Sequence, residues 1–255
     1  VSPIEFLTGT TWTAAFGEDF SWDKDWGVLP LVSATFMATA VALVVAIPLG
    51  LGAAMFLSEY ASQRVRKIFK PILEVLAGIP TVVYGFLALV VITPLLKPLL
   101  GIPGTYSILT AGLVMGFMII PTVASLSEDA MSAVPQALRQ GSFALGANKM
   151  RTTLRVVVPA ALSGIVAAIV LGLSRAIGET LILAVAGGNI ARLSGDPRDE
   201  AQTMTAFIVQ IATGDAPQGS PAYYAIFAVG ALLFAITLVI NLISIRLVRK
   251  YRQAY

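Results

Sequence analysis

The sequence contains no cysteine and no histidine among its 255 residues. Their absence excludes disulfides, thiolate chemistry, histidine-based acid–base catalysis and metal ligation through these two residue types. Charged residues are scarce as well, at 12%, whereas 57% of the residues are hydrophobic and the mean hydropathy is +0.84. Because a water-soluble domain cannot bury so much apolar surface, the composition predicts a membrane protein.

Long uncharged runs predict an all-α polytopic membrane fold, since several exceed the roughly 20 residues that a helix needs to cross a bilayer. We predict five spans, which are residues 28–57, 71–98, 106–127, 157–187 and 222–246. An external N-terminal segment (1–27) would precede a transmembrane domain (28–255), which carries a cytoplasmic loop at 127–156. No signal peptide is present to export the first segment, so we expect a sixth span upstream.

Lysine and arginine separate sharply between the segments that join these spans. Twelve of the seventeen lie on one side: Arg64, Arg66, Lys67, Lys70, Arg139, Lys149, Arg151, Arg155, Arg246, Arg249, Lys250 and Arg252. The other side holds Lys24, Lys97, Arg192 and Arg198, and Arg175 lies inside a span. Because cytoplasmic loops are enriched in positive charge, we expect the twelve, and the C-terminus with them, in the cytoplasm.

The loop between the third and fourth predicted spans contains residues that typically begin, end or cap helices. Pro135 suits the first position of a short helix over 135–145, Gly146 suits its end, and Asn148 can cap the next helix. Small and apolar residues on a helix outside the membrane suit docking into a partner's groove. The predicted docking residues are Ala137, Leu138, Gly141, Ser142, Ala144, Leu145 and Gly146. An ordinary cytoplasmic turn is the alternative.

Two ionisable residues fall inside the span predicted at 157–187. Arg175 and Glu179 are four residues apart, which would place both side chains on one helix face. They would form either an ion pair that only locks helix packing or a site on a substrate path. A guanidinium offers planar paired donors that suit a tetrahedral oxyanion.

Proline and glycine also interrupt the second predicted span at GIPTVVYG (78–85). In lipid, broken helices are tolerated where protein or a water-filled cavity satisfies the freed backbone groups. The segment is either a kink that serves packing or part of the translocation path, where Thr81 and Tyr84 would offer hydroxyls.

The loop motif resembles the EAA loop of ABC importer permeases, E-A-A-x3-G-x9-I-x-L-P. Here the first three residues are Gln140-Gly-Ser and depart from the pattern, but the spacing from Gly146 to Val156-Val-Val-Pro159 is intact. The wider chain resembles the PstC-type permeases of phosphate importers. That resemblance rests on FLTGTTWT (6–13), LSEYAS (57–62), LAGIPTVVYGF (76–86), GLVMGFMIIPTVASLSEDAMSAVP (112–135) and SRAIGETLILAVAGG (174–188).

The resemblance implies a MetI-like type I importer permease in a bacterial inner membrane. The partners implied are a PstA-type permease, two PstB-type ATPase subunits and a PstS-type phosphate-binding protein, with no nucleic acid. ATP and magnesium would bind the ATPase subunits, and this chain would need no cofactor. In the family, the R-x3-E element that matches Arg175 and Glu179 is associated with phosphate translocation.

The residues themselves agree that any ATP hydrolysis occurs on another polypeptide, since the nucleotide-binding pattern G-x4-G-K-[ST] does not occur in the sequence. Three alternatives stay open. The same importer could carry sulfate, molybdate or another oxyanion. The chain could be an ATP-independent carrier or channel, although no inverted repeat is evident. An intramembrane enzyme is the third, but no catalytic constellation supports it, so we expect no enzyme.

Overall fold

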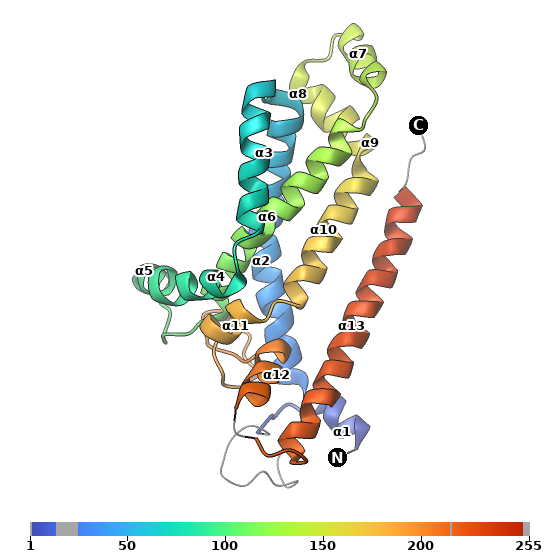
Figure 1. The fold of residues 1–255 in the computed structure, drawn as a ribbon. Coiled ribbons are helices and arrows are strands. Elements are labelled where there is room, and N and C mark those ends of the chain that lie inside the picture. The colour runs from blue at the N-terminus through green and yellow to red at the C-terminus, as the bar shows by residue number, and fades with distance from the viewer. Residues whose placement is uncertain (1, 14–24, 215, 252–255) are drawn as a thin grey trace. The chain divides into compact units, whose positions relative to one another are not determined.

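The computed structural model describes residues 2–13, 25–214 and 216–251, which are mostly helical (Figure 1). The chain divides into two compact units, each assembled from three separate stretches. Unit 1 comprises Val1–Ala42, Pro80–Gly116 and Ala176–Leu238. Unit 2 comprises Leu43–Ile79, Phe117–Arg175 and Val239–Tyr255. Three long helices contribute residues to both units: α2 (Leu29–Met55), α6 (Ile108–Ser132) and α13 (Pro221–Tyr251).

Unit 1 is built around an aromatic core. Besides parts of the long helices it contains α1 (Pro3–Thr8), α4 (Thr81–Leu87), the π-helical turn η2 (Ala88–Ile92), α5 (Thr93–Leu100), α11 (Leu181–Ala186) and α12 (Met204–Thr213). Trp12 is 2% exposed and meets the ring of Phe207 edge-on, with 5.0 Å between centroids. Trp12 and Trp26 of the predicted external segment 1–27 are therefore packed into this core, whereas the described residues of α1 are mostly exposed. Residues 1 and 14–24 of the segment lie outside the described residues.

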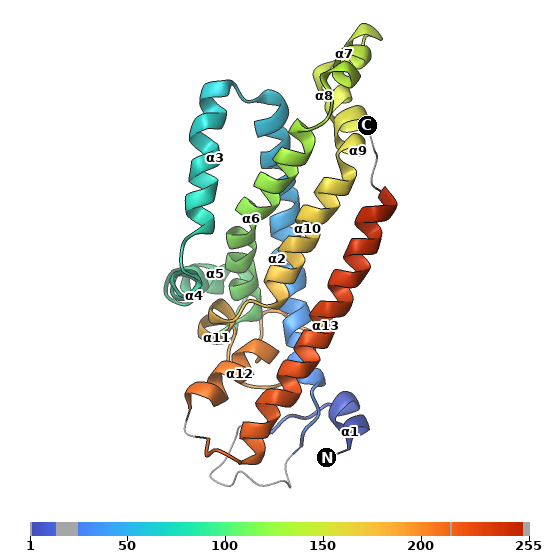
Figure 2. The ribbon, with the colours of Figure 1, turned by 45° about the vertical axis from the view of Figure 1, so that its right-hand side comes forward.

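Unit 2 contains the predicted cytoplasmic loop. Its elements are the π-helical turn η1 (Phe56–Tyr60), α3 (Gln63–Ala77), α7 (Gln136–Ala144), α8 (Lys149–Thr152), the π-helical turn η3 (Thr153–Val157), α9 (Val158–Ala160) and α10 (Leu162–Ile177). A small core joins Ala54, Met131 and Val157. In Figure 2, α7 and α8 lie at the end of this unit, beyond α9 as seen from α10.

Three predicted spans match single long helices. Leu29–Tyr60, Ile108–Ser132 and Pro221–Arg246 are each long and apolar enough to cross a bilayer. Within the described residues, Thr81–Leu100 is a fourth such stretch, and a bent pair of helices makes a fifth if it counts as one span. The structure thus agrees with an all-α membrane protein.

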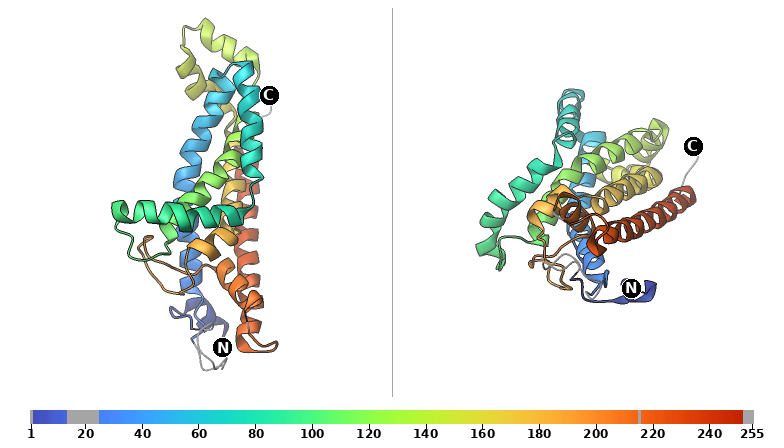
Figure 3. Two further views of the ribbon diagram at one scale, coloured as in Figure 1. Left: turned by 60° about the vertical axis from the view of Figure 1, so that its left-hand side comes forward. Right: turned by 60° about the horizontal axis from the view of Figure 1, so that its bottom comes forward.

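The span predicted at 71–98 is present as Thr81–Leu100 but begins later than predicted, because the helix breaks at Gly78–Pro80. Helix α3 ends at Ala77 and α4 begins at Thr81, since Pro80 lacks an amide hydrogen and disfavours helical geometry in the residue before it. Figure 3 shows α4, η2 and α5 crossing the first part of α2 at a steep angle.

The span predicted at 157–187 is also broken. The segment Lys149–Ala160 meets Leu162–Ile177 at a bend of 73°. Pro159, next to this bend, cannot donate a helical hydrogen bond. Helix α10 then ends at Ile177, and α11 begins only at Leu181. The helical periodicity assumed for residues 175–179 therefore does not apply.

Candidate functional site

The helix predicted in the cytoplasmic loop is present as α7, and most of the predicted boundary and capping residues are confirmed. Pro135 stands directly before the helix rather than at its first position. Gly146 has φ +82°, a left-handed conformation that favours glycine. The Asn148 side chain accepts a hydrogen bond from the Arg151 amide at 2.8 Å and caps α8.

The predicted docking residues are exposed, with one exception. Leu145 is 91% exposed, and Leu138, earlier in the same loop, is exposed as well. Ser142 is half-buried, because its hydroxyl lies 2.9 Å from that of Thr152. Two large apolar residues, Phe143 and Met150, are exposed in the same region. The predicted docking residues did not include these two.

Arg139, the cation of α7, forms a buried ion pair in unit 2. It is 7% exposed, and its Nη2 donates to Glu59 Oε1 at 2.9 Å. The guanidinium also donates to the backbone carbonyls of Met131 and Val134. Sequence analysis placed Arg139 only among the cytoplasmic cations and did not select Glu59. The partners are 80 residues apart, so no local pattern could have paired them.

A second buried carboxylate lies close by on α6. Glu128 is 1% exposed and forms ion pairs with Arg66 and with Lys70, whose Nζ lies 3.1 Å away. Lys70 also pairs with exposed Asp129 at 2.6 Å. Two of the predicted cytoplasmic cations therefore hold α3 against α6. A polar pocket of about 280 Å³ lies beside this cluster, with Glu59 and Arg139 in its lining.

Arg175 lies near the end of α10 in unit 2. Its side chain is half-buried, and Nη1 donates to the Thr122 hydroxyl of α6 at 3.2 Å. The preceding residue, Ser174, donates to Asn241 at 2.7 Å. The guanidinium's contact with Thr122 is to a neutral hydroxyl, which does not compensate its charge.

Glu179 lies in unit 1, in the non-helical link between α10 and α11. It is 7% exposed, and its Oε1 accepts hydrogen bonds from the amides of Leu181 at 3.1 Å and Ile182 at 3.3 Å. This carboxylate therefore caps the start of α11. The expectation that Arg175 and Glu179 share one helix face is wrong, because α10 ends at Ile177. Their roles in transport stay predictions.

Thr81 and Tyr84 are half-buried residues of α4. This helix packs closely against α11 through Gly85, where an added Cβ would come within 3.1 Å of the Leu181 carbonyl oxygen. The predicted break in the segment 78–85 is therefore confirmed, and the backbone after it approaches the helix that Glu179 caps. A role of the two hydroxyls in a path stays a prediction.

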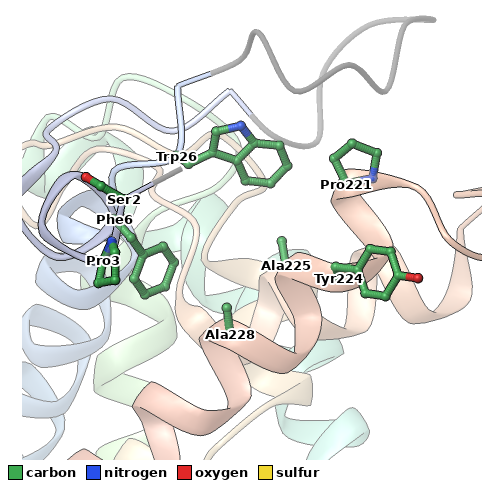
Figure 4. Close-up of a pocket in the computed structure, with 8 residues that line it drawn as sticks. All are labelled: Ser2, Pro3, Phe6, Trp26, Pro221, Tyr224, Ala225 and Ala228. Atoms are coloured by element: carbon green, nitrogen blue, oxygen red, sulfur yellow. The ribbon is translucent and has the colours of Figure 1, made fainter.

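Unit 1 also contains an apolar pocket of about 330 Å³, shown in Figure 4. Phe6 and Trp26 form one wall, and Tyr224, Ala225 and Ala228 of α13 form the other (Figure 4). Because its walls are mostly apolar, this pocket provides few groups that could bind an anion.

The segment 188–221, which joins α11 to α13 and contains α12, holds a local ion pair. Arg198 donates to Asp196 at 2.6 Å, and this hydrogen bond lowers the pKa of the Asp196 carboxyl to about 2. A carboxyl with a lowered pKa stabilises the fold above its ordinary pKa and loses that contribution only as the pH falls through about 2. The pair therefore stays ionised throughout the physiological range.

The chain is similar to known transport proteins over nearly its whole length. Residues 46–253 match the family described as "Binding-protein-dependent transport system inner membrane component". The "Probable ABC transporter permease protein YqgH" of Bacillus subtilis is 38% identical, over 98% of this chain and 77% of that protein. The "Phosphate transport system permease protein PstC" of Mesorhizobium japonicum is 32% identical, over 94% and 77%; that of Haemophilus influenzae is 32% identical, over 91% and 80%.

Solved structures support the fold. An inward-facing MetNI methionine ABC transporter chain aligns with a TM-score of 0.63 at 21% identity, over 89% of this chain and 95% of that chain. A bacterial ABC transporter chain involved in importing the acidic polysaccharide alginate aligns with a TM-score of 0.64 at 16% identity, over 88% and 80%. This chain therefore belongs to the family of binding-protein-dependent transport system inner membrane components, the permease subunits of ABC importers.

Proposed function

We propose that this chain is a permease subunit of an ATP-driven importer of inorganic phosphate in a bacterial inner membrane. The observation that carries the proposal is the group of relatives named as phosphate transport permeases, which are about one-third identical over more than nine-tenths of the chain. Its partners would be a PstA-type permease, two PstB-type ATPase subunits that bind ATP and magnesium, and a PstS-type phosphate-binding protein.

The exposed surface of α7 supports coupling to a separate ATPase. Leu138, Phe143 and Leu145 present apolar side chains next to a glycine-terminated helix end. Apolar side chains on a helix outside the membrane are of the kind that enter a groove of another protein. Movement of the ATPase subunits would then reach the membrane helices through α7.

Arg175 is the residue we propose for contact with phosphate. Its guanidinium is half-buried and donates to the hydroxyl of Thr122, which leaves further N–H groups for an oxyanion. A single arginine that is hydrogen-bonded to a neutral hydroxyl would pass an anion without holding it tightly, as transport requires. Glu179, Thr81 and Tyr84 belong to the same proposed path as weaker candidates.

The test is phosphate uptake by proteoliposomes that contain this chain with all three kinds of partner, with and without internal ATP. Wild-type protein should need ATP, and Arg175→Gln should lower uptake by about tenfold or more without loss of assembly, as expected when a charge-assisted contact is removed. Lys97→Gln, which removes an exposed cation from α5, is the matched control and should transport normally.

The outcomes separate the parts of the proposal. Uptake without ATP would indicate a carrier or channel and refute the importer role. Full uptake by Arg175→Gln would show that this residue has a structural role.

A second candidate substrate is another oxyanion. The YqgH relative carries no substrate in its name, and a guanidinium can donate hydrogen bonds to any tetrahedral oxyanion. Uptake of sulfate or molybdate in place of phosphate would support it.

A further inference from the structure

Arg139 is the only charged residue of α7, and its side chain is the one that the helix buries. The neighbouring Leu138 and Gln140 are exposed. Bringing a guanidinium out of water is costly unless its charge and its N–H groups are satisfied. A helix used only as a docking surface would be held more simply by apolar contacts, so the buried arginine calls for an explanation.

The guanidinium joins three elements of unit 2. Its Nε and Nη2 donate to the carboxylate of Glu59, with distances of 3.4 and 2.9 Å. Nη2 also donates to the Met131 carbonyl at 2.8 Å, and Nη1 donates to the Val134 carbonyl. Met131 is in the last turn of α6, where carbonyl groups lack helical partners and carry partial negative charge. One side chain of α7 thus binds the end of α6 and the carboxylate that follows α2.

Glu59 is itself placed by an unusual piece of backbone. It lies in η1, a π-helical turn closed by the hydrogen bond from the Ala61 amide to the Phe56 carbonyl at 2.8 Å. Such turns occur mostly as single insertions in α-helices and are frequent at functional sites. Glu59 is 8% exposed, like its partner, so both charges of the pair are withdrawn from water.

A second contact, about one turn further along α7, holds this helix to the next one. Ser142 meets the Thr152 hydroxyl at 2.9 Å, close to the π-helical turn η3. Both groups are neutral, and a single hydroxyl contact is weaker than a two-pronged contact between a guanidinium and a carboxylate. The contact through Arg139 is therefore the stronger polar link between α7 and the membrane helices.

We infer that Arg139 and Glu59 are a positioning pair that transmits movement of α7 to the ends of α2 and α6. The inference rests on the proposed function, because it assumes that an ATPase subunit moves α7. The pair touches neither the exposed docking surface nor Arg175. Its loss should uncouple the ATPase from transport without removing either site.

The experiment uses the complete complex and a double-mutant cycle of Glu59→Gln, Arg139→Gln and both changes together. Glu59→Gln is the decisive single change, because glutamine keeps the size of the side chain while removing its charge. Asp129→Asn is the control, since Asp129 also pairs with a cation of unit 2, is exposed and lies on α6 rather than α7. Assembly, basal ATP hydrolysis and hydrolysis stimulated by the loaded binding protein are measured for each.

We expect each single variant to assemble and to keep basal hydrolysis. The stimulated hydrolysis should fall by about tenfold, a typical size for coupling between two sites. The double variant should lose no more than a single one, because the partners act through each other. Arg139→Lys, which keeps the charge but not the fork of donors, should retain part of the stimulation.

Three results would overturn the inference. Stimulation could be unchanged in Glu59→Gln, the losses could multiply in the double variant, or basal and stimulated hydrolysis could fall in parallel with assembly, as for a merely structural pair. Failure of the proposed substrate is separable. If the wild-type complex is stimulated by a binding protein loaded with another oxyanion and not with phosphate, the substrate is wrong, and the same cycle is run with that anion.

Discussion

Buried charges in this chain occur in partnerships rather than alone. Glu128 pairs with two cations of α3, Glu59 pairs with Arg139, and Glu179 binds the amides that begin α11. Each arrangement satisfies a carboxylate that would otherwise be costly to bury. Substituting these carboxylates one at a time can distinguish a carboxylate that stabilises the fold from one that takes part in transport.

Glu128→Ala should lower the free energy of unfolding by about 2 kcal/mol, because it leaves Arg66 and Lys70 close together without their buried partner. Loss of a fully buried partner would cost more, but both cations are about one-third exposed and water offsets part of the penalty. Thermal and denaturant unfolding in detergent would measure the change. Asp129→Asn should alter stability by less than about 0.5 kcal/mol, and an equal loss there would contradict the argument.

Glu179 allows a sharper separation of roles. Glu179→Gln keeps an oxygen that can accept from Leu181 and Ile182, whereas Glu179→Ala removes the cap and should cost about 1 kcal/mol. If the carboxylate only caps α11, the glutamine variant should transport normally and the alanine variant should show faster amide exchange at residues 181–182. Reduced transport by the glutamine variant with unchanged exchange would instead assign the charge to the substrate path.

At the scale of elements, the helices are interrupted where proline, glycine or a capping side chain frees the backbone. The breaks at Gly78–Pro80 and after Ile177 divide two stretches whose hydropathy alone suggested single spans. The helix α7 is similarly bounded, by Pro135 before it and Gly146 after it. These boundaries determine which side chains share a face, and so which residues can act together.

Gly146→Val should reduce ATP-coupled uptake while membrane insertion stays intact. A β-branched residue at φ +82° is strained by about 1–2 kcal/mol, which would shift the end of α7 and the exposed Leu145 beside it. Gly146→Asn is the control, since asparagine tolerates the left-handed region better and should retain more uptake. Normal uptake and insertion by the valine variant would show that this conformation is not needed for coupling.

At the scale of the whole molecule, charge follows the division into units. Arg66, Arg139 and Arg246, one from each group of the predicted cytoplasmic cations, belong to unit 2, whereas Lys97, Arg192 and Arg198 belong to unit 1. The same separation that suggests sidedness from the sequence is thus reproduced by the grouping of the folded chain. From this grouping we predict that these cations of unit 2 lie in the cytoplasm and that those of unit 1 lie on the opposite side of the membrane.

Single cysteines would test this sidedness directly, because the native sequence contains none. A membrane-impermeant maleimide added outside right-side-out vesicles should label Gly195→Cys, which has open space in the segment 188–221, and should not label Gln63→Cys at the exposed start of α3. Both should react after the membrane is permeabilised. The opposite labelling pattern would reverse the predicted orientation.

The sequence by itself determined the features that depend on composition or on a few neighbouring residues. Hydropathy identified a membrane protein, and Pro135, Gly146 and Asn148 indicated the short helix and its caps, because capping acts over three or four residues. The family resemblance agreed with the comparisons for the same reason, since its motifs are local strings. The apolar stretch predicted at 157–187, in contrast, did not show that α10 ends at Ile177, and so the shared helix face assumed for Arg175 and Glu179 was wrong.

Only the tertiary structure decided which distant side chains meet. Arg139 and Glu59 are separated by 80 residues, and Lys70 and Glu128 by 58, so no periodicity could pair them. Trp12, part of a segment expected to lie outside the membrane domain, packs into the core of unit 1. These contacts arise because burying a charge or a large ring is favourable only where packing brings a suitable partner, and packing is a property of the folded chain.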